Sequence, residues 1–282
     1  MSRPLPGPVG FLHPGAMGAE LAATCAGERR WLSSGRSEAT ARRAESAGLL
    51  ACESLDEMVA SCPTIVSVCP PDAAEDVAAD VAGAGFNGIY VDANALAPKT
   101  ARRIGERFDH FVDGGIIGLP PTVAGTTRLY LSGAEARTVA NLWEGSLLEV
   151  RLVEGGAGAA SAVKVCFAAW TKGTSALLMA IRALAESEGV TDSLVGEWET
   201  SMPDLIPRAE FTASRVSPKA WRFAGEMEEI ASAFGAHGLP SGFHSAAAEI
   251  YAALEGFKDQ SPGPTLNEVL DALTGQASRS GS

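Results

Sequence analysis

The stretch Val9-Gly10-Phe11-Leu12-His13-Pro14-Gly15-Ala16-Met17-Gly18 decides the fold of the N-terminal half. A short apolar run with β propensity leads through a turn into a helical pattern that continues to Ala26. Continuous apolar runs then alternate with helical patterns, which is typical of βαβ units around a parallel sheet. These runs cover Trp31-Leu32 and residues 64–69, 88–92, 111–117, 128–131 and 147–152. The first half is therefore predicted to be an α/β domain.

The second half changes character after residue 152. Residues 158–188 form one long helical pattern that is rich in Ala and apolar on nearly every side, which is typical of a helix buried between domains or in a subunit interface. Only helical patterns follow, at residues 193–201, 217–237, 241–257 and 265–274. We expect an α/β domain at 1–155 and an all-α domain at 156–282, joined by the long interdomain helix.

Composition excludes several classes of protein. The 282 residues carry 22 Lys and Arg against 34 Asp and Glu, a net charge of −12 that disfavours nucleic acid and anionic membranes as partners. Five cysteines without a CxxC pair and four histidines give no support for a zinc site and favour a reduced, cytoplasmic protein. Residues 1–6 lack the apolar segment of a signal peptide, and Lys164, Lys172 and Arg182 interrupt the longest apolar region.

The turn at residues 13–18 has the spacing of the dinucleotide-binding fingerprint. Gly15 and Gly18 occupy its second and third glycine positions, while His13 stands at the first. A strand–turn–helix of this kind presents backbone N–H groups to a pyrophosphate, although a turn that serves only packing is the alternative. We expect a Rossmann domain in which the cofactor contacts His13, Pro14, Gly15, Ala16 and Met17.

The segment after the second apolar run predicts which cofactor is used. NAD-binding domains commonly place an acidic residue there, whereas this chain has Ser33-Ser34-Gly35-Arg36-Ser37. Hydroxyls and a guanidinium can bind a 2′-phosphate through charge-assisted hydrogen bonds. The sequence therefore favours NADP over NAD, with Ser33, Ser34, Arg36 and Ser37 at the phosphate; a solvated Arg36 is the alternative.

Further segments carry a resemblance to a known family. Gly15-Ala16-Met17-Gly18, residues 91–98 (Val-Asp-Ala-Asn-Ala-Leu-Ala-Pro), residues 113–118 and Gly155-Gly156-Ala157-Gly158 with the following Lys164 occur in order along nearly the whole chain. In these segments the chain resembles the 6-phosphogluconate dehydrogenase-like superfamily, which includes the β-hydroxyacid dehydrogenases and imine reductases. It is similar in particular to a subgroup described only as phosphogluconate dehydrogenase-like. The resemblance implies a Rossmann domain, a helical C-terminal domain and a homodimer whose helical domains intertwine.

The resemblance also implies a set of site residues. Lys164 matches the proton donor or acceptor of the family, and its apolar surroundings should lower its pKa. Helical spacing places Ala168 and Thr171 on the side of Lys164, and Asn94 is expected at the carboxyl end of a strand, beside the cofactor. Alternatives are a Lys164 that reaches solvent from the helix end, a Thr171 that bonds its own backbone, and an Asn94 that caps a helix. We expect Cys69 and Pro70 at the cofactor as well, and at the substrate Gly114, Gly115, Ile116, Lys164, Ala168, Thr171 and Lys172.

Two departures from the family pattern bear on the substrate. Ala168 stands where β-hydroxyacid members place an Asn, and Gly114-Gly115-Ile116 replaces a serine-bearing substrate segment. Both remove donors that would grip a hydroxyacid carboxylate. The leading hypothesis is an NADP-dependent oxidoreductase acting on a small hydroxyacid, carbonyl or imine, with catalysis by Lys164, Thr171 and Asn94 and no metal. The alternatives are an imine reductase-type enzyme with an apolar site and a non-catalytic dinucleotide sensor.

Overall fold

The structure, a computed structural model, describes residues 7–275. The expected N-terminal segment 1–6 and polar tail 276–282 lie outside the described residues. The chain divides into two compact units, Met1–Val165 and Cys166–Ser282. The division falls inside helix α7 (Ala159–Ser187), whereas the boundary expected from the sequence, at 155/156, lies just before that helix.

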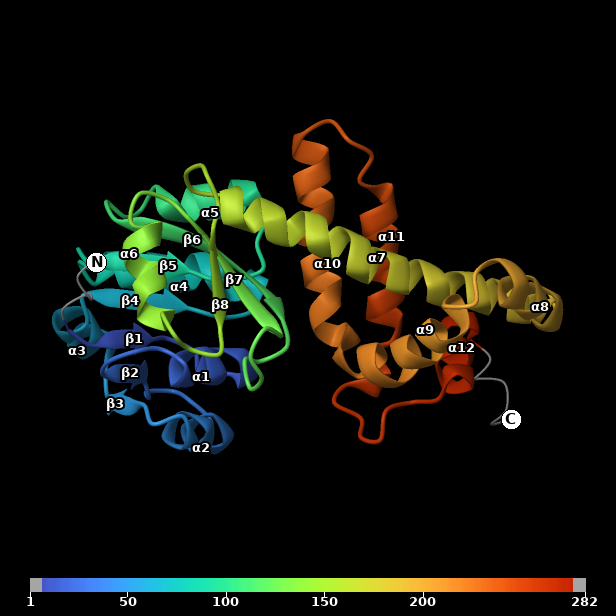
Figure 1. Cartoon of the computed structure of the whole chain (residues 1–282), viewed down its shortest axis with the longest axis horizontal. Coiled ribbons are helices and arrows are strands. Elements are labelled where there is room, and N and C mark those ends of the chain that lie inside the picture. The colour runs from blue at the N-terminus through green and yellow to red at the C-terminus, as the bar shows by residue number, and fades with distance from the viewer. Residues whose placement is uncertain (1–6, 276–282) are drawn as a thin grey trace. The chain divides into compact units, whose positions relative to one another are not determined.

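The first unit is built on an eight-stranded sheet with the order β3-β2-β1-β4-β5-β6-β7-β8 (Figure 1). All neighbouring strands are parallel, as expected, except β6 and β7, which pair antiparallel. The link between them, residues 119–126, is too short for a crossover helix and permits only antiparallel pairing. The strands are β1 (Val9–Phe11), β2 (Arg29–Leu32), β3 (Leu50–Cys52), β4 (Thr64–Ser67), β5 (Ile89–Asp92), β6 (Phe111–Gly118), β7 (Thr127–Ser132) and β8 (Glu149–Leu152).

Two apolar clusters cover the two faces of this sheet, because neighbouring residues of a strand point to opposite faces. Val66 and Val91 belong to one cluster, with side chains from α1, α2 and α6, while Ile65 and Tyr90 belong to the other, with side chains from α3, α4 and α5. These helices are α1 (Ala16–Ala23), α2 (Glu38–Ser46), α3 (Leu55–Ser61), α4 (Ala74–Gly83), α5 (Pro98–Gly105) and α6 (Ala136–Ala140). The expected α/β domain is thus confirmed as a three-layer unit.

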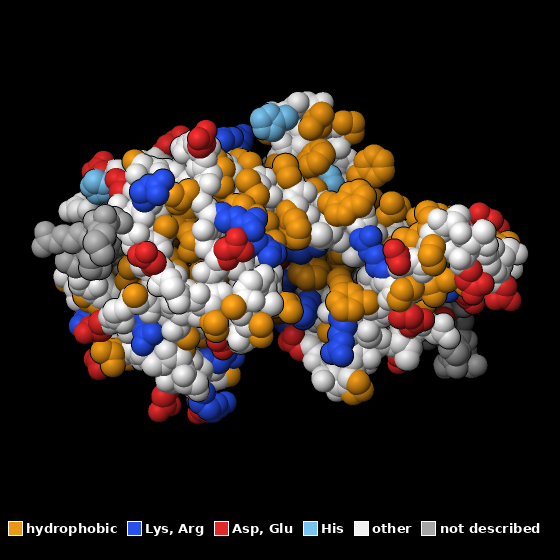
Figure 2. All heavy atoms as spheres, in the orientation of Figure 1, with side chains coloured by type: hydrophobic (Ala, Val, Ile, Leu, Met, Phe, Trp, Pro, Cys, Tyr) orange, Lys and Arg blue, Asp and Glu red, His pale blue; other side chains and the backbone are white. Residues whose placement is uncertain are grey.

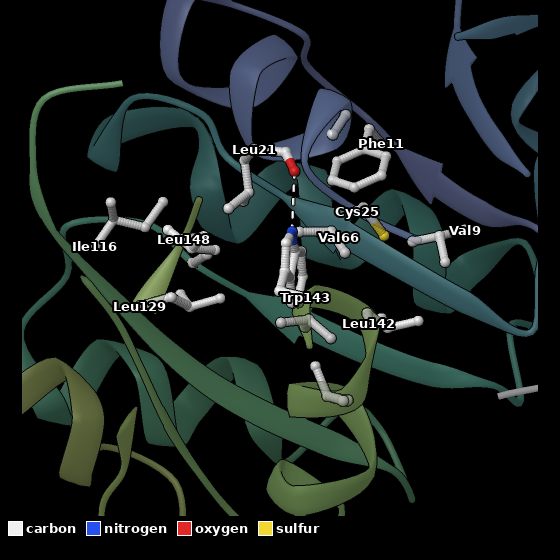
Figure 3. Close-up of a cluster of buried hydrophobic side chains, with 14 of the residues drawn as sticks. Val9, Phe11, Leu21, Cys25, Val66, Ile116, Leu129, Leu142, Trp143 and Leu148 are labelled. Atoms are coloured by element: carbon white, nitrogen blue, oxygen red, sulfur yellow. Dashed lines mark hydrogen bonds between the residues drawn. The ribbon is translucent and has the colours of Figure 1, made fainter. Parts of the chain in front are cut away.

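Trp143 is a buried member of the first of these clusters, the one that contains Val66 and Val91. Its indole is buried, and Nε1 donates a hydrogen bond of 2.9 Å to the carbonyl oxygen of Leu21 in α1 (Figure 3). Since a buried indole N–H needs an acceptor, this bond fixes the segment after α6 against the first helix. The helix that follows the glycine turn is thereby held from a part of the chain far along the sequence.

Helices joined by loops make up the described part of the second unit, which contains no strand, as expected. Besides most of α7 it contains α8 (Thr191–Ser201), α9 (Leu205–Phe211), α10 (Ala220–Ala236), α11 (Gly242–Ala253) and α12 (Leu266–Thr274). Tyr251 of α11 anchors α7 through a 2.8 Å hydrogen bond from its hydroxyl to the carbonyl oxygen of Lys172. Helix α9 and the π-helical turn Thr212–Val216 that follows it were missed by the sequence patterns.

Helix α7 is not buried on every side within the described chain. Phe167, Trp170, Leu177, Ile181 and Leu184 are 37–68% exposed. Figure 2 shows apolar side chains gathered along this helix. The expectation of burial therefore holds for only one side of α7 in the single chain.

Candidate functional site

The candidate site lies at one edge of the sheet in the first unit. Strands β1, β4, β5 and β6 run parallel to one another, so their carboxyl ends meet at the same edge. Open α/β sheets bind ligands outside these ends, so we call this side of the sheet the ligand edge. The glycine turn follows β1, Cys69 follows β4, and Asn94 follows β5.

The glycine turn fits a pyrophosphate. Helix α1 begins directly after Gly15, and no side chain caps its first N–H groups. A Cβ on Gly15 would meet no atom within 4 Å, so packing does not explain this glycine, whereas a Cβ on Gly18 would collide with the carbonyl oxygen of His13. Open space at the second glycine and close packing at the third are what the fingerprint requires. The turn therefore has the two features by which this fingerprint admits a pyrophosphate.

His13 and Arg36 present buried polar groups beside this turn. Nδ1 of His13 and Nε of Arg36 are buried and have no hydrogen-bond partner among the described residues. Burial, with a smaller contribution from Arg36, lowers the pKa of His13 to about 4. Unsatisfied buried groups of this kind are costly, and an anionic ligand between them would remove the cost.

The serines expected at the 2′-phosphate divide into two groups. Ser33 Oγ donates to the carbonyl oxygen of Cys52 at 2.8 Å, and Ser37 Oγ accepts from the backbone N–H of Thr40 as the N-cap of α2. Both hydroxyls thus already serve the fold. Ser34 is exposed in the same loop.

Asn94 is tied into a buried network at the ends of β4 and β5. Its Oδ1 accepts the N–H of Cys69 at 2.6 Å, and its Nδ2 donates to Asp92 at 2.9 Å and to Ser67 at 3.3 Å. The N-cap of α5 is Ala97, so Asn94 does not cap that helix. In this geometry Asn94 holds the Cys69-Pro70 loop, and the cofactor contact expected of it stays a prediction.

Asp92 is fully buried beside this amide. Burial raises its pKa to about 7, and the neighbouring Asp113 adds to the rise, while hydrogen bonds from Asn94 oppose it. Asp92 and Asp113 occupy paired positions of β5 and β6. The sheet therefore carries two adjacent buried carboxyl groups directly behind the site.

Lys164 lies in the second turn of α7, against β6. Its Nζ donates a 2.7 Å hydrogen bond to the carbonyl oxygen of Ile116, and burial lowers its pKa to about 8. A Cβ on Gly115 would lie 2.8 Å from the Ala160 carbonyl oxygen and 3.0 Å from Lys164 Cβ. The glycine thus permits the close approach of α7 to the strand that places the amine.

The substrate residues expected on β6 lie within the strand rather than at its end. Gly114 and Gly115 are buried, and a Cβ on Gly114 would lie 2.9 Å from the Asp92 carbonyl oxygen. The strand ends at Gly118, which has φ of +125°, and Leu119 follows with 66% of its surface exposed. Gly118, the last residue of the expected segment 113–118, and Leu119, which the sequence analysis did not include, therefore reach the ligand edge, and the two prolines after them mark the end of the strand.

The remaining expected residues belong to the second unit. Ala168 is buried, and Thr171 Oγ1 donates to the carbonyl oxygen of Phe167 at 3.1 Å, which is the backbone alternative considered above. Lys172 forms an ion pair with Glu226, and its Nζ lies 4.3 Å from the centroid of the Phe223 ring. Their roles at a substrate stay predictions.

Residues 7–275 contain no group of three or more His, Cys, Asp or Glu side chains that could hold a metal ion. None of the helices described is both long and apolar enough to span a membrane.

Comparisons with known proteins place the fold. Residues 185–254 match a family model described as "Domain of unknown function (DUF1932)". An uncharacterized 28.5 kDa protein of Methanothermus fervidus is 29% identical over 163 residues, which are 57% of this chain and 63% of that protein. The chain therefore spans less than two thirds of the length of this curated relative.

Solved structures cover nearly the whole chain. The conserved protein MTH1747, whose function is unknown and which is described as structurally similar to 3-hydroxyacid dehydrogenases, aligns with a TM-score of 0.67 and 27% identity over 89% of this chain and 97% of its own. Mycobacterium tuberculosis 3-hydroxyisobutyrate dehydrogenase aligns with a TM-score of 0.67 and 19% identity over 95% and 99%. The chain has the β-hydroxyacid dehydrogenase fold.

A more distant neighbour has the same fold. A reductive aminase of Aspergillus terreus, solved with NADPH and ethyl levulinate, aligns with a TM-score of 0.53 and 15% identity over 95% of this chain and 99% of its own. The fold is thus an open α/β sheet, in which ligands generally bind outside the carboxyl ends of the strands.

The raised pKa of Asp92 predicts how stability depends on pH. Between the unfolded value of 3.8 and the folded value of about 7, the unfolded chain has released a proton that the folded chain retains. Stability from this group is therefore greatest below the lower value and falls as pH rises toward 7. An asparagine at this position cannot ionise, so the Asp92→Asn variant should lose less stability than the parent as pH rises. Its unfolding free energy relative to the parent should increase by on the order of 1 kcal/mol between about pH 5.5 and about pH 7.5.

Urea unfolding at the two pH values measures this difference, with the exposed Asp109→Asn as the control. The control should show no such pH-dependent difference from the parent. Equal behaviour of the two variants would contradict the assignment of a proton to buried Asp92.

Proposed function

We propose that the protein is an NADP-dependent oxidoreductase that transfers hydride between NADP(H) and a small hydroxyacid, carbonyl or imine. The observation that carries this proposal is Lys164 of α7, a largely desolvated amine with a pKa of about 8 that donates a hydrogen bond to the Ile116 carbonyl oxygen of β6, the strand that reaches the ligand edge. An amine with a pKa near the working pH is suited to general acid–base catalysis. It lies in the same unit as a glycine turn with open space at Gly15.

The residues present fit the cofactor. The N–H groups after Gly15 would hold the pyrophosphate, and Arg36, with Ser34 beside it, would hold the 2′-phosphate. The loop at Cys69, pinned by Asn94, would cover the dinucleotide. When bound, the nicotinamide supplies or accepts the hydride.

Lys164 would manage the proton. When the pH is below the Lys164 pKa of about 8, the amine is charged and can donate a proton to the oxygen or nitrogen that the hydride transfer makes basic. In the opposite direction the neutral amine accepts the proton of the substrate. Reduction should therefore slow as pH rises through about 8, and oxidation should speed up.

An imine reductase-type activity is the second candidate. Ala168 in place of an amide side chain, together with Ile116, Ile117 and Leu119 near the end of β6, favours apolar substrate contacts over a carboxylate grip. A reductive aminase and an imine reductase of the same fold support this candidate. A dinucleotide sensor without catalysis is the third candidate. Such a protein would bind NADPH tightly and would turn over no keto acid, aldehyde or cyclic imine.

We propose that the enzyme acts in the cytoplasm.

We also propose that two copies of the chain pair through α7. The exposed apolar residues Phe167, Trp170, Leu177, Ile181 and Leu184, with Thr174 between them, recur at alternating steps of three and four along the helix. This is the spacing at which one helix packs along another. A second copy presents the same stripe, so a two-fold pair would bury both.

Arg36→Ala tests the cofactor assignment. Loss of a charge-assisted bond to the 2′-phosphate should weaken NADPH binding about 10-fold or more and leave NADH binding nearly unchanged. Titration of each cofactor by nucleotide fluorescence measures both. Arg42→Ala, an exposed arginine paired with Glu38 in α2, is the matched control. NADPH affinity no lower than in that control would remove Arg36 from the site.

Lys164→Met tests the proton donor. It should lower kcat by about 10²-fold or more while NADPH binding changes little, because a positioned acid or base contributes that much to the reaction. NADPH oxidation is followed against keto acids, aldehydes and cyclic imines. Lys99→Met, an exposed lysine on α5, should retain the parent rate. If Lys164→Met retains kcat within a few-fold, Lys164 is not the proton donor.

Leu177→Lys tests the pairing of two copies. A charge in the middle of the stripe should convert a dimer into a monomer, because burial of an unpaired ammonium opposes association. Light scattering coupled to gel filtration gives the mass. Leu50→Lys, which changes an exposed leucine of β3 in the first unit, should remain dimeric. A monomeric parent protein, or a dimeric Leu177→Lys, would show that the stripe does not join two copies.

A further inference from the structure

Helix α7 cannot cap its own N-terminus with a side chain. It begins at Ala159, directly after Gly158, which has φ of +91°. A Cβ on Gly158 would also lie 2.8 Å from the Pro98 carbonyl oxygen. This position thus excludes the Ser, Thr, Asp and Asn residues that usually satisfy the first N–H groups of a helix.

The missing caps come from the sheet. Ser161 N–H donates to Asp113 Oδ2 at 3.0 Å, and Ser161 Oγ donates to Asp113 Oδ1 at 2.5 Å. The N–H of Ala160 donates to Ser132 Oγ at 3.1 Å, and that hydroxyl lies 3.1 Å from Asp113 Oδ2. Asp113, Ser132 and Ser161 are at most 1% exposed. A carboxylate in this place is stabilised by the helix dipole and also satisfies the helix end.

The cap and Lys164 are parts of one contact between β6 and α7. Asp113 holds Ser161, Gly115 admits the helix backbone at Ala160, and the Ile116 carbonyl accepts the Lys164 amine. Lys164 follows Ser161 by one helical turn, so it lies above the capped turn on nearly the same side. The depth at which the amine sits therefore depends on how firmly this first turn is held.

We propose that Asp113 is a positioning residue for Lys164: by capping α7 from β6 it holds the lysine amine in its desolvated place at the ligand edge. Asp113 does not touch the reacting atoms. The placement of the amine stands on this geometry alone, and only its consequence for turnover rests on the proposed function.

The placement is measured without any substrate. The pH dependence of acetylation of the Lys164 amine by acetic anhydride, read by mass spectrometry, reports its pKa directly. In the parent chain the midpoint should lie at about 8. In Asp113→Ala the uncapped turn loosens, water reaches the amine, and the midpoint should rise by about one pH unit or more. Asp113→Asn should show a smaller rise, because its amide oxygen still accepts the Ser161 N–H.

Asp92→Asn is the matched control. Asp92 is an equally buried carboxyl at the paired position of β5, but its hydrogen bonds go to Asn94 rather than to α7. It should leave the Lys164 midpoint unchanged. An equal shift in Asp92→Asn and Asp113→Ala would reduce the role of Asp113 to general stability and overturn the proposal.

Turnover supplies the second readout. If the chain reduces a substrate with NADPH, Asp113→Ala should lower kcat about 10-fold, move the pH profile upward and keep NADPH affinity within about two-fold. If Asp113→Ala does not fold, Asp113→Asn and Ser161→Ala decide, since each removes only part of the cap. An unchanged midpoint in folded Asp113 and Ser161 variants overturns the proposal, whereas a shifted midpoint without turnover in the parent chain overturns only the proposed function.

Discussion

Two buried carboxyl groups at paired positions of neighbouring strands organise the ligand edge of this protein. Asp92 of β5 holds Asn94, which in turn pins the loop after β4, and Asp113 of β6 holds the first turn of α7. Each carboxyl accepts hydrogen bonds from neighbouring backbone and side-chain groups. The proximity of Asp113 contributes to the raised pKa of Asp92. Burial of both groups is tolerated because each one accepts hydrogen bonds from the segment that it holds.

The glycines of the first unit serve this arrangement in different ways. Gly15 leaves open space where a pyrophosphate would approach, Gly18 allows α1 to pack against the turn, and Gly115 allows α7 to lie close to β6. The net charge of −12 describes the whole chain, whereas the two cations proposed for the site, Arg36 and Lys164, are partly and largely buried. An acidic chain can thus hold an anionic cofactor through a few positioned groups.

The alternation of apolar runs and helical patterns predicted the sheet and its helices because buried parallel strands read as continuous apolar segments. β3 was missed since two of its three residues are exposed. β7 was expected as a strand, but its antiparallel pairing with β6 was not, because an apolar run does not show the direction in which a strand pairs. Lys164 was found through its motif. The cap by Asp113 was not, because its partner Ser161 lies 48 residues away and only the folded chain brings them together.

A crystal structure of the protein with NADPH tests the central claim most directly. The account predicts the pyrophosphate on the N–H groups after Gly15, the 2′-phosphate on Arg36, and the nicotinamide ring within reach of the Lys164 amine. It also predicts that Asp113 keeps its bonds to Ser161 in that complex. A cofactor bound with its nicotinamide away from Lys164, or no binding at the glycine turn at millimolar NADPH, would contradict it.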